Sequence, residues 1–281
     1  MNEKQRTLYV SDMDGTLLNS ESVISPATAD SLNRLIEQRD ALFTVATART
    51  PATAVPLLEK VRLQLPMIVM TGAATWNPTT AAYENVHAIP NSTVRRIVEA
   101  FTAHGLSPFV YRRRGNKLQA HHAGMLSEPE KEFVAQRQGL KLKKFFFDET
   151  PLQACGRGEA MLIFSMNDYS RLEPVYDILK QMTDCSPNFY RDIFTPEVGL
   201  LDIYAEQCSK AAAITALAQR INAQRIVVFG DNLNDIAMMQ AATHAVAVDN
   251  AVPQVKEIAH EIIGDNDHNS VATWIEQDLN K

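Results

Sequence analysis

The chain has 281 residues, of which 46% are hydrophobic and 21% are charged, and its formal net charge is −6 at pH 7. This length allows one or two domains with a sizeable core, and the composition is that of an ordinary globular protein. The negative net charge argues against a wide nucleic-acid interface. A site that binds an anionic ligand in this protein would need local positive charge or a metal.

Targeting and membrane signals are not evident in the sequence. Residues 1–6 lead directly into an apolar strand pattern without a signal-peptide region, and no apolar run approaches the roughly 18 residues that cross a bilayer. Three scattered cysteines, Cys155, Cys185 and Cys208, are too few for a disulfide framework or a zinc site. We therefore expect free thiols, a cytoplasmic protein and no membrane partner.

Apolar, β-favouring runs alternate with helical patterns through the first 82 residues. Strands are predicted at residues 7–10, 41–46 and 67–70, and helices begin at the cap signals Ser25-Pro26 and Thr50-Pro51. Alternating strands and helices are typical of an α/β fold with a doubly wound parallel sheet.

The pattern changes near residue 83 and resumes after residue 195. Between them we expect a self-contained α/β region, with helices at 92–104 and 170–182 and strands at 107–113, 141–147 and 160–166. Segment 114–159 is polar and irregular, and its adjacent pair His121-His122 is expected at the surface. The later strands and helices are predicted at residues 200–204, 210–222, 225–229, 244–248 and 271–279. The chain is thus predicted to form a core from residues 1–82 and 196–281, with residues 83–195 as an inserted domain.

Two carboxylates, Asp12 and Asp14, follow the first predicted strand and precede Gly15. If the backbone stays extended through Asp14, both carboxylates leave the same side of the strand. Their mutual repulsion then favours protonation of one carboxylate or a cation bound between them. Gly15 permits the turn that follows. An Asx-rich turn that ends the strand is the structural alternative.

Further polar residues follow other core strands or begin core helices. Ligands of open α/β sheets bind at the carboxyl ends of the strands, where we expect Asp12 and Asp14, Thr47 and Arg49, Lys210, and Asp231, Asn234 and Asp235 to gather. Their hard oxygen donors favour Mg²⁺. Each residue also has a structural interpretation: Thr47 as a strand-end hydroxyl, Arg49 as a brace for loop carboxylates, Lys210 as a solvated side chain, and the Asp231–Asp235 loop as a turn with a helix cap.

A cation is disfavoured where Lys210 begins a predicted helix. The helix dipole makes that position unfavourable for a positive charge by roughly 0.3–1 kcal/mol. An opposing carboxylate or a bound phosphate would explain the lysine.

Four ordered segments resemble the motifs of the haloacid dehalogenase superfamily, and more narrowly those of its Cof-type phosphatases. They are Asp12-Met13-Asp14-Gly15-Thr16, Thr47-Ala48-Arg49, Ser209-Lys210 and Gly230-Asp231-Asn232-Leu233-Asn234-Asp235. The resemblance implies a Rossmann-like core with an α/β cap inserted between the second and third motifs. The sequence departs from the family where Thr71-Gly72-Ala73 replaces the usual Asn-Gly-Ala and where Ala48 replaces a common glycine.

By this resemblance the chain is expected to hydrolyse a small phosphorylated metabolite through an aspartyl-phosphate, with a sugar phosphate as the first candidate. It assigns Asp12 as nucleophile and Asp14 as general acid and base. Mg²⁺ is assigned to Asp12, the carbonyl of Asp14, and Asp231. Phosphate binding is assigned to Thr47, Lys210, Asn234 and the amides of Met13 and Ala48, with Asp235 and Arg49 in supporting roles.

Some alternatives stay open at this point. A phosphotransferase or mutase would pass the phosphoryl group to a sugar, and a phosphosugar-sensing module would use the same fold without turnover. Residues 111–114, Tyr-Arg-Arg-Arg, are either a cationic contact for a second anionic group or a solvated strand end. The oligomeric state is left open.

Overall fold

The computed structural model describes residues 5–124, 126–147, 150–192 and 195–281. The chain divides into two compact units. Unit 1 comprises residues 1–84 and 209–281, and unit 2 comprises residues 85–208.

Unit 1 is built on a parallel sheet of five strands with the order β14-β13-β12-β1-β2. The strands are β1 (Thr7–Ser11), β2 (Leu42–Val45), β12 (Arg225–Gly230), β13 (His244–Val248) and β14 (Glu261–Ile263). The central strands are buried on both faces, which explains their nearly continuous apolar sequences. The prediction of a doubly wound α/β fold is confirmed.

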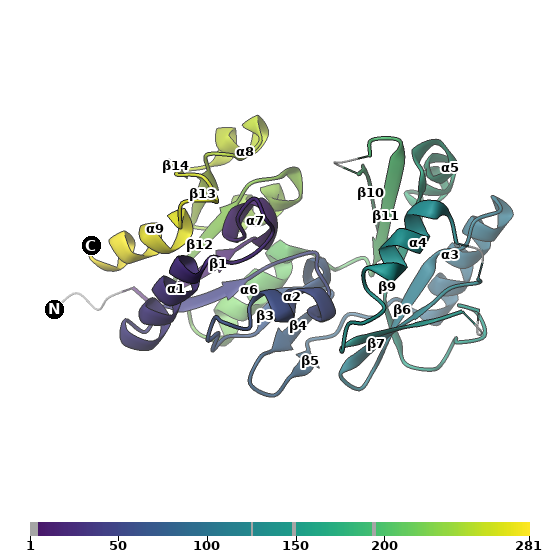
Figure 1. The fold of residues 1–281 in the computed structure, drawn as a ribbon, viewed down its shortest axis with the longest axis horizontal. Helices are drawn as coiled ribbons and strands as arrows, with labels where there is room; N and C mark the ends of the chain where they lie inside the picture. Colours follow the sequence, from purple (N-terminus) through teal and green to yellow (C-terminus); the bar gives the residue numbers. More distant parts are fainter. Residues whose placement is uncertain (1–4, 125, 148–149, 193–194) are drawn as a thin grey trace. The chain divides into compact units, whose positions relative to one another are not determined.

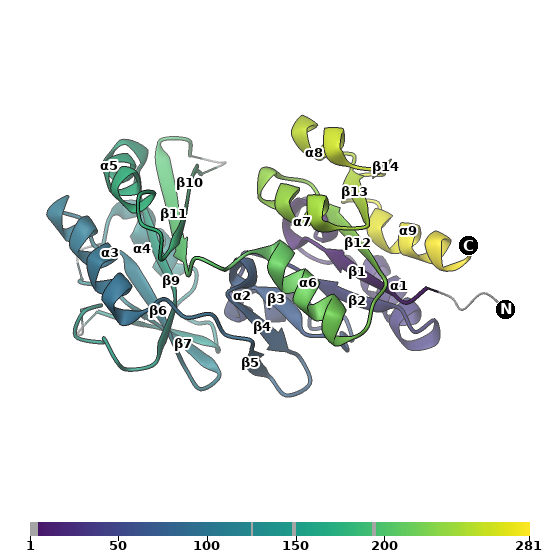
Figure 2. The ribbon, with the colours of Figure 1, turned by 180° about the vertical axis from the view of Figure 1, so that it is seen from behind.

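Helices cover both faces of this sheet. α1 (Pro26–Gln38) and α9 (Ser270–Leu279) pack side by side, and α6 (Lys210–Arg220) lies on the opposite face (Figures 1 and 2). The shorter helices are α2 (Pro51–Leu57), α7 (Ile236–Ala241) and α8 (Pro253–Ile258). The cap signal that predicted α1 is present, because the Ser25 side chain accepts a hydrogen bond from the Thr28 amide.

The third predicted strand of the core lies in a separate small sheet. β3 (Met67–Val69) pairs with β4 (Ala74–Asn77), which pairs with β5 (Ala82–Glu84), all antiparallel. One parallel bridge, Ala46 to Ile68, links β3 to the main sheet. The tight turn between β3 and β4 diverts the chain into a meander instead of a helical crossover.

Unit 2 contains a six-stranded sheet with the order β10-β11-β9-β6-β7-β8. Its strands are β6 (Phe109–Arg114), β7 (Lys117–His121), β8 (Lys143–Phe146), β9 (Glu159–Asp168), β10 (Ser186–Arg191) and β11 (Val198–Tyr204). Helices α3 (Asn91–Ala103) and α5 (Tyr169–Leu179) pack together on one face, and α4 (Glu128–Ala135) packs against β9 (Figures 1 and 2).

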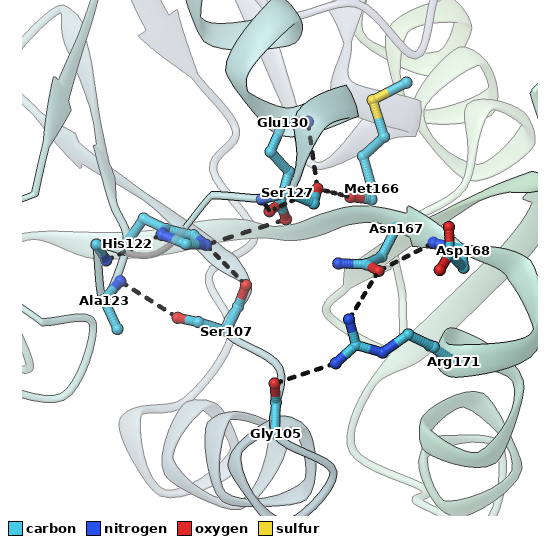
Figure 3. A network of polar contacts seen from close by, with 11 residues as sticks. Gly105, Ser107, His122, Ala123, Ser127, Glu130, Met166, Asn167, Asp168 and Arg171 are labelled. Carbon is cyan, nitrogen blue, oxygen red and sulfur yellow. Dashed lines mark hydrogen bonds and ion pairs between the residues drawn. The ribbon is translucent and has the colours of Figure 1, made fainter.

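Two expectations for this part of the chain were wrong. β11 was assigned to the core, but it is antiparallel to β9 and β10, so unit 2 extends to residue 208 instead of ending at 195. His121 and His122 are buried instead of exposed, with 2% and 0% of their surface accessible. Figure 3 shows the His122 ring between Ser107, whose carbonyl it contacts at 2.8 Å, and the buried Glu130.

Among the described residues no helix is long and apolar enough to span a membrane. The three cysteines are free thiols, as expected from their spacing. Most of the core consists of aliphatic and aromatic side chains, and its buried ionic groups are few. Several of those ionic groups lie where the strands of unit 1 end.

Candidate active site

The site in unit 1 forms where β1 and β12 end side by side. The two strands are parallel and in register, with Ser11 opposite Phe229, and the Asp12 amide donates to the Phe229 carbonyl at 2.9 Å. Asp12 directly follows β1, and Asp231 directly follows β12. Adjacent parallel strands therefore bring two carboxylates together that are far apart in the sequence.

Lys210 lies between two of the carboxylates. Its Nζ atom is 2.5 Å from Asp12 Oδ1 and 2.8 Å from Asp235 Oδ1. All three side chains are at least nine-tenths buried. The interpretation of Lys210 as a solvated side chain is therefore wrong. The two neighbouring carboxylates explain why a positively charged residue is found at the start of α6.

Burial sets the proton affinities in this cluster. Burial raises the pKa of Asp12 well above its usual value, with the Lys210 ammonium acting against it and Asp235 adding to it. Burial alone would lower the pKa of Lys210, but Asp12 and Asp235 together raise it. Three carboxylates thus gather around a single ammonium in this cluster.

The Asp231 loop is fixed by hydrogen bonds from both sides. Thr16 Oγ1 donates to Asp231 Oδ1 at 2.7 Å, and Asp235 Oδ2 accepts from the amides of Asp231 and Asn232 at 3.1 and 3.2 Å. Burial raises the pKa of Asp231 to about 6. Asp235 thus holds both Lys210 and the Asp231 backbone in place, which fits the supporting role expected for it.

Gly15 is required by two features of the turn after Asp14. Its φ of +77° lies in the left-handed region, and a Cβ atom at this position would lie 2.5 Å from Asp231 Oδ2. A side chain would therefore strain the backbone and displace Asp231. The backbone angles of Asp12 (φ −61°, ψ 164°) and Asp14 (φ −76°, ψ 121°) are both extended, but the tight turn of residues Met13–Leu17 begins between them, so the strand does not continue through Asp14.

Asp14 pairs with Arg49 instead of joining the buried carboxylates. Arg49 Nε donates to Asp14 Oδ2 at 2.7 Å, and Nη2 donates to Asp14 Oδ1 at 2.5 Å. Half of the Asp14 side chain is exposed. Although burial alone would lower the pKa of Arg49, the hydrogen bond to Asp14 raises it. Arg49 does brace a loop carboxylate, and that carboxylate is Asp14.

The other expected phosphate-binding residues lie on loops at this edge of the sheet. Thr47 is buried, and its Oγ1 accepts the Arg49 amide at 3.1 Å. Ala48 and Asn234 are exposed, and the Asn234 side chain forms no hydrogen bond with any described residue. Met13 is fully buried.

Two residues of the site were missed in the sequence. Thr16 binds Asp231, and the Asn250 side chain donates to the Gly15 carbonyl at 2.7 Å. Asn250 lies in the loop after β13, where the Val252 amide also donates to the Asp231 carbonyl at 2.9 Å. The rule that identified Asp12 and Asp231, a polar residue directly after a core strand, points to this loop but to Asp249, because Asn250 lies two residues after the end of β13.

The carboxylates fit a divalent cation. Asp12, Asp231 and Asp235 each offer an oxygen, and these atoms lie within 4.8 Å of one another. Hard carboxylate oxygens suit Mg²⁺, and a dication would offset the negative charge that Lys210 leaves unbalanced. Asp235 already binds Lys210 and two amides, so Asp12 and Asp231 are the better ligands.

Comparisons with known proteins agree with this architecture. Residues 9–275 match the family model described as haloacid dehalogenase-like hydrolase. The chain is 28% identical to the 5-amino-6-(5-phospho-D-ribitylamino)uracil phosphatase YwtE of Bacillus subtilis, over 95% of this chain and 96% of that protein. It is 24% identical to the pyridoxal phosphate phosphatase YbhA of Escherichia coli, over 94% of this chain and 95% of that protein. The crystal structure of a haloacid dehalogenase-like hydrolase from Bacteroides thetaiotaomicron is similar to this structure, with a TM-score of 0.78 and 23% sequence identity. The similarity covers 98% of this chain and 99% of that chain.

Proposed function

Because the chain belongs to the haloacid dehalogenase-like hydrolase family, we propose that it is a Mg²⁺-dependent phosphatase acting on a small phosphorylated metabolite. The observation that carries the proposal is the buried group of Asp12, Asp231 and Lys210 where β1 and β12 end. This group combines a candidate nucleophile, candidate metal ligands and a cation for phosphoryl oxygens.

Asp12 is the proposed nucleophile. Its carboxylate attacks phosphorus, a bond from Asp12 to phosphorus forms, and the bond to the leaving oxygen breaks as Asp14 gives that oxygen a proton. Water then attacks phosphorus in the aspartyl-phosphate and gives a proton to Asp14, the bond between Asp12 and phosphorus breaks, and inorganic phosphate leaves with the Asp12 carboxylate restored. Arg49 holds both Asp14 oxygens, so one of them must leave the guanidinium before Asp14 transfers a proton.

The remaining residues position the phosphoryl group. Lys210, Thr47 and Asn234 bind its oxygens in this proposal, with the amides of Met13 and Ala48 as further donors. Asp235 fixes the Lys210 ammonium, as the 2.8 Å contact supports. Asp12, Asp231 and the Asp14 carbonyl would hold Mg²⁺, which when bound neutralises charge between nucleophile and phosphate.

The substrate class is small phosphorylated metabolites. A sugar phosphate remains the first candidate from the family resemblance. The relatives named above are phosphatases of a phosphoribitylamino-uracil and of pyridoxal phosphate, so these two compounds belong in the same panel.

The decisive experiment measures phosphate release from this panel with Mg²⁺ and with a chelator. Wild type should release phosphate only with the metal, and Asp12→Asn should lose at least about a thousandfold in kcat while keeping its circular dichroism spectrum. Asp249→Asn is the matched control, because this carboxylate is exposed and pairs with Lys256 at 3.3 Å.

Substantial phosphate release by Asp12→Asn would refute the nucleophile. Release unaffected by the chelator would refute the metal dependence. Adding an acceptor sugar tests the phosphotransferase alternative, since phosphoryl transfer at the expense of inorganic phosphate would show that water is not the acceptor.

A further inference from the structure

Asn250, in the loop after β13, uses both ends of its side-chain amide. Nδ2 donates to the Gly15 carbonyl at 2.7 Å, and Oδ1 accepts from the Asn266 amide at 3.0 Å. These partners fix the orientation of the side chain, because a carbonyl can only accept a hydrogen bond and a backbone amide can only donate one. Asn250 therefore links the turn after Asp12 to the loop that follows β14.

The loop after β14 holds the same turn at its far end. The Asn266 side chain donates to the Leu18 carbonyl at 2.8 Å, and Asp267 Oδ1 accepts from the Ser20 amide at 2.8 Å. Asn266 thus contacts the chain just beyond the turn with its side chain, and it contacts Asn250 with its backbone amide. The two asparagines form a continuous bridge across the turn.

The loop that contains Asn250 also holds the loop that contains Asp231. The Val252 amide donates to the Asp231 carbonyl at 2.9 Å, and Thr16 Oγ1 donates to Asp231 Oδ1 at 2.7 Å. With the contact between Asn250 and Gly15, these hydrogen bonds close a triangle of three loops, which follow β1, β12 and β13. The proposed Mg²⁺ ligands lie in two of these loops.

Gly15 is the residue of the turn that most needs a restraint from outside. Without a Cβ atom a glycine populates more backbone conformations than any other residue, so its own sterics do not select the observed φ of +77°. Gly15 lies directly after the Asp14 carbonyl, a proposed Mg²⁺ ligand, and directly before Thr16. Rotation at Gly15 would therefore move the Asp14 carbonyl relative to Asp231. The hydrogen bond from Asn250 opposes that rotation.

We propose that Asn250 is a positioning residue of the Mg²⁺ site, which raises metal affinity by holding the loops after β1 and β12 together before the metal binds. This role rests on the proposed function, because Asn250 can position a metal site only if Mg²⁺ binds there. Asn250 acts through the Gly15 carbonyl and not on the metal itself. Residues that orient metal ligands typically change metal affinity about 10–100-fold when they are lost. The Asn250 side chain is exposed, so its removal leaves no cavity in the core.

Metal affinity can be measured without turnover. Mn²⁺ is titrated into the metal-free full chain while electron paramagnetic resonance reports the free ion, and Mg²⁺ is then added as a competitor. Asn250→Ala removes both contacts of the amide, whereas Asn266→Ala removes only its side-chain contact and keeps its backbone amide. Asn33→Ala is the matched control. Asn33 also uses both ends of its amide, donating to the Lys60 carbonyl at 2.9 Å and accepting from the Arg62 amide at 2.8 Å, but it joins α1 to the loop before β3.

We expect wild type and Asn33→Ala to bind Mn²⁺ equally, Asn250→Ala to bind it about tenfold more weakly, and Asn266→Ala to lie between them. Circular dichroism checks that each variant is folded. A purely structural contact would leave the affinity of the folded protein unchanged, so the proposal is wrong if Asn250→Ala binds Mn²⁺ as tightly as wild type. It is also wrong if Asn33→Ala is weakened as much as Asn250→Ala. A wild type that binds no Mn²⁺ would instead refute the metal site of the proposed function, and the role of Asn250 with it.

Discussion

Lys210 offsets part of the negative charge of the core site, because it contacts two of the three carboxylates that gather there. Removing one partner of a buried ion pair leaves an uncompensated charge in a poorly solvated place. The same residue is proposed to bind phosphoryl oxygens, so its effect on stability has to be separated from its effect on turnover.

We predict that Lys210→Met loses about 3–5 kcal/mol of unfolding free energy in metal-free buffer at neutral pH. Mg²⁺ should restore part of the loss, because a dication bound to the folded state supplies the missing positive charge. Urea denaturation with and without Mg²⁺ measures both effects. Lys256→Met is the control, since Lys256 pairs with an Asp249 side chain that is 70% exposed and should contribute at most about 1 kcal/mol. Equal losses in the two variants would contradict the prediction.

Long-range contacts explain why part of this site could not be read from the sequence. The positions of Asp12 and Asp231 follow from a local rule, since each comes directly after a buried strand of a parallel sheet. The pairing of Asp14 with Arg49 depends on how two loops fold over that edge, which strand patterns do not encode. Asn250 reaches Gly15 across 235 positions, for the same reason.

At the scale of elements, the turn between β3 and β4 supports the loop that contains Thr47 and Arg49. The amides of Met70 and Thr71 donate to the carbonyls of Arg49 and Thr47 at 3.0 and 3.1 Å. Thr71 adopts the left-handed conformation, with φ 54° and ψ 30°. A β-branched residue is strained there, by about 1–3 kcal/mol. This is the position at which the resemblance described in the sequence analysis implies asparagine.

Thr71→Asn should therefore raise the unfolding free energy by about 1 kcal/mol, because asparagine tolerates left-handed angles better than threonine. Chemical denaturation measures the gain. Thr71→Val keeps the β-branch and should show no gain. If valine stabilises as much as asparagine, backbone strain is not the cause.

In unit 2, β8 begins with a buried lysine among aromatic rings. Lys143 Nζ lies 5.2–5.4 Å from the ring centres of Tyr111, Phe133 and Phe145, and the residue is 5% exposed. Burial lowers the pKa of Lys143 to about 7, and Arg137, in the turn after α4, adds to the effect. The rings attract the ammonium, but they do not offset its loss of hydration.

The sign of the resulting pH dependence follows from proton counting. Between pH 7 and 10.5 the unfolded chain keeps the Lys143 proton that the folded chain has released, so unfolding free energy rises with pH in this window. We predict that wild type gains stability relative to Lys143→Met as the pH increases from 7 to 9, measured by denaturation at each pH. The exposed neighbour Lys144, 5.0 Å from the Phe146 ring, supplies the control Lys144→Met, whose difference from wild type should not change with pH. A constant difference for Lys143→Met would contradict the assignment.

β11 and β7 show what strand patterns leave undetermined. The run Val198–Tyr204 is apolar, and the same run suits a parallel core strand or an inner strand of an antiparallel sheet. The partners of β11 decide between these alternatives, and its pairing with β9 joins residues as far apart in the sequence as Ile163 and Ile203. The polar, irregular appearance of segment 114–159 likewise hid β7, and with it the burial of His121 and His122.

At the scale of the whole molecule, the two units differ in how the chain builds them. Unit 2 is one continuous segment, whereas unit 1 needs both ends of the chain, because β1 from the first segment lies between β2 and β12. Each unit has a sheet with its own helices and its own apolar core. A core that is complete within one segment does not require the rest of the chain to fold.

Residues 85–208 should therefore fold when expressed alone, and unfold in urea in a single cooperative transition. The reason is that Phe109, Ile163 and Leu201, on neighbouring strands of its sheet, are all within this segment and at most 1% exposed. Residues 1–84 are the control: without β12, β1 loses a hydrogen-bonded neighbour on one side and α6 is absent, so this piece should remain unfolded. A gradual, non-cooperative transition for residues 85–208, with exposed apolar surface detected by dye binding, would mean that the core of unit 2 depends on unit 1.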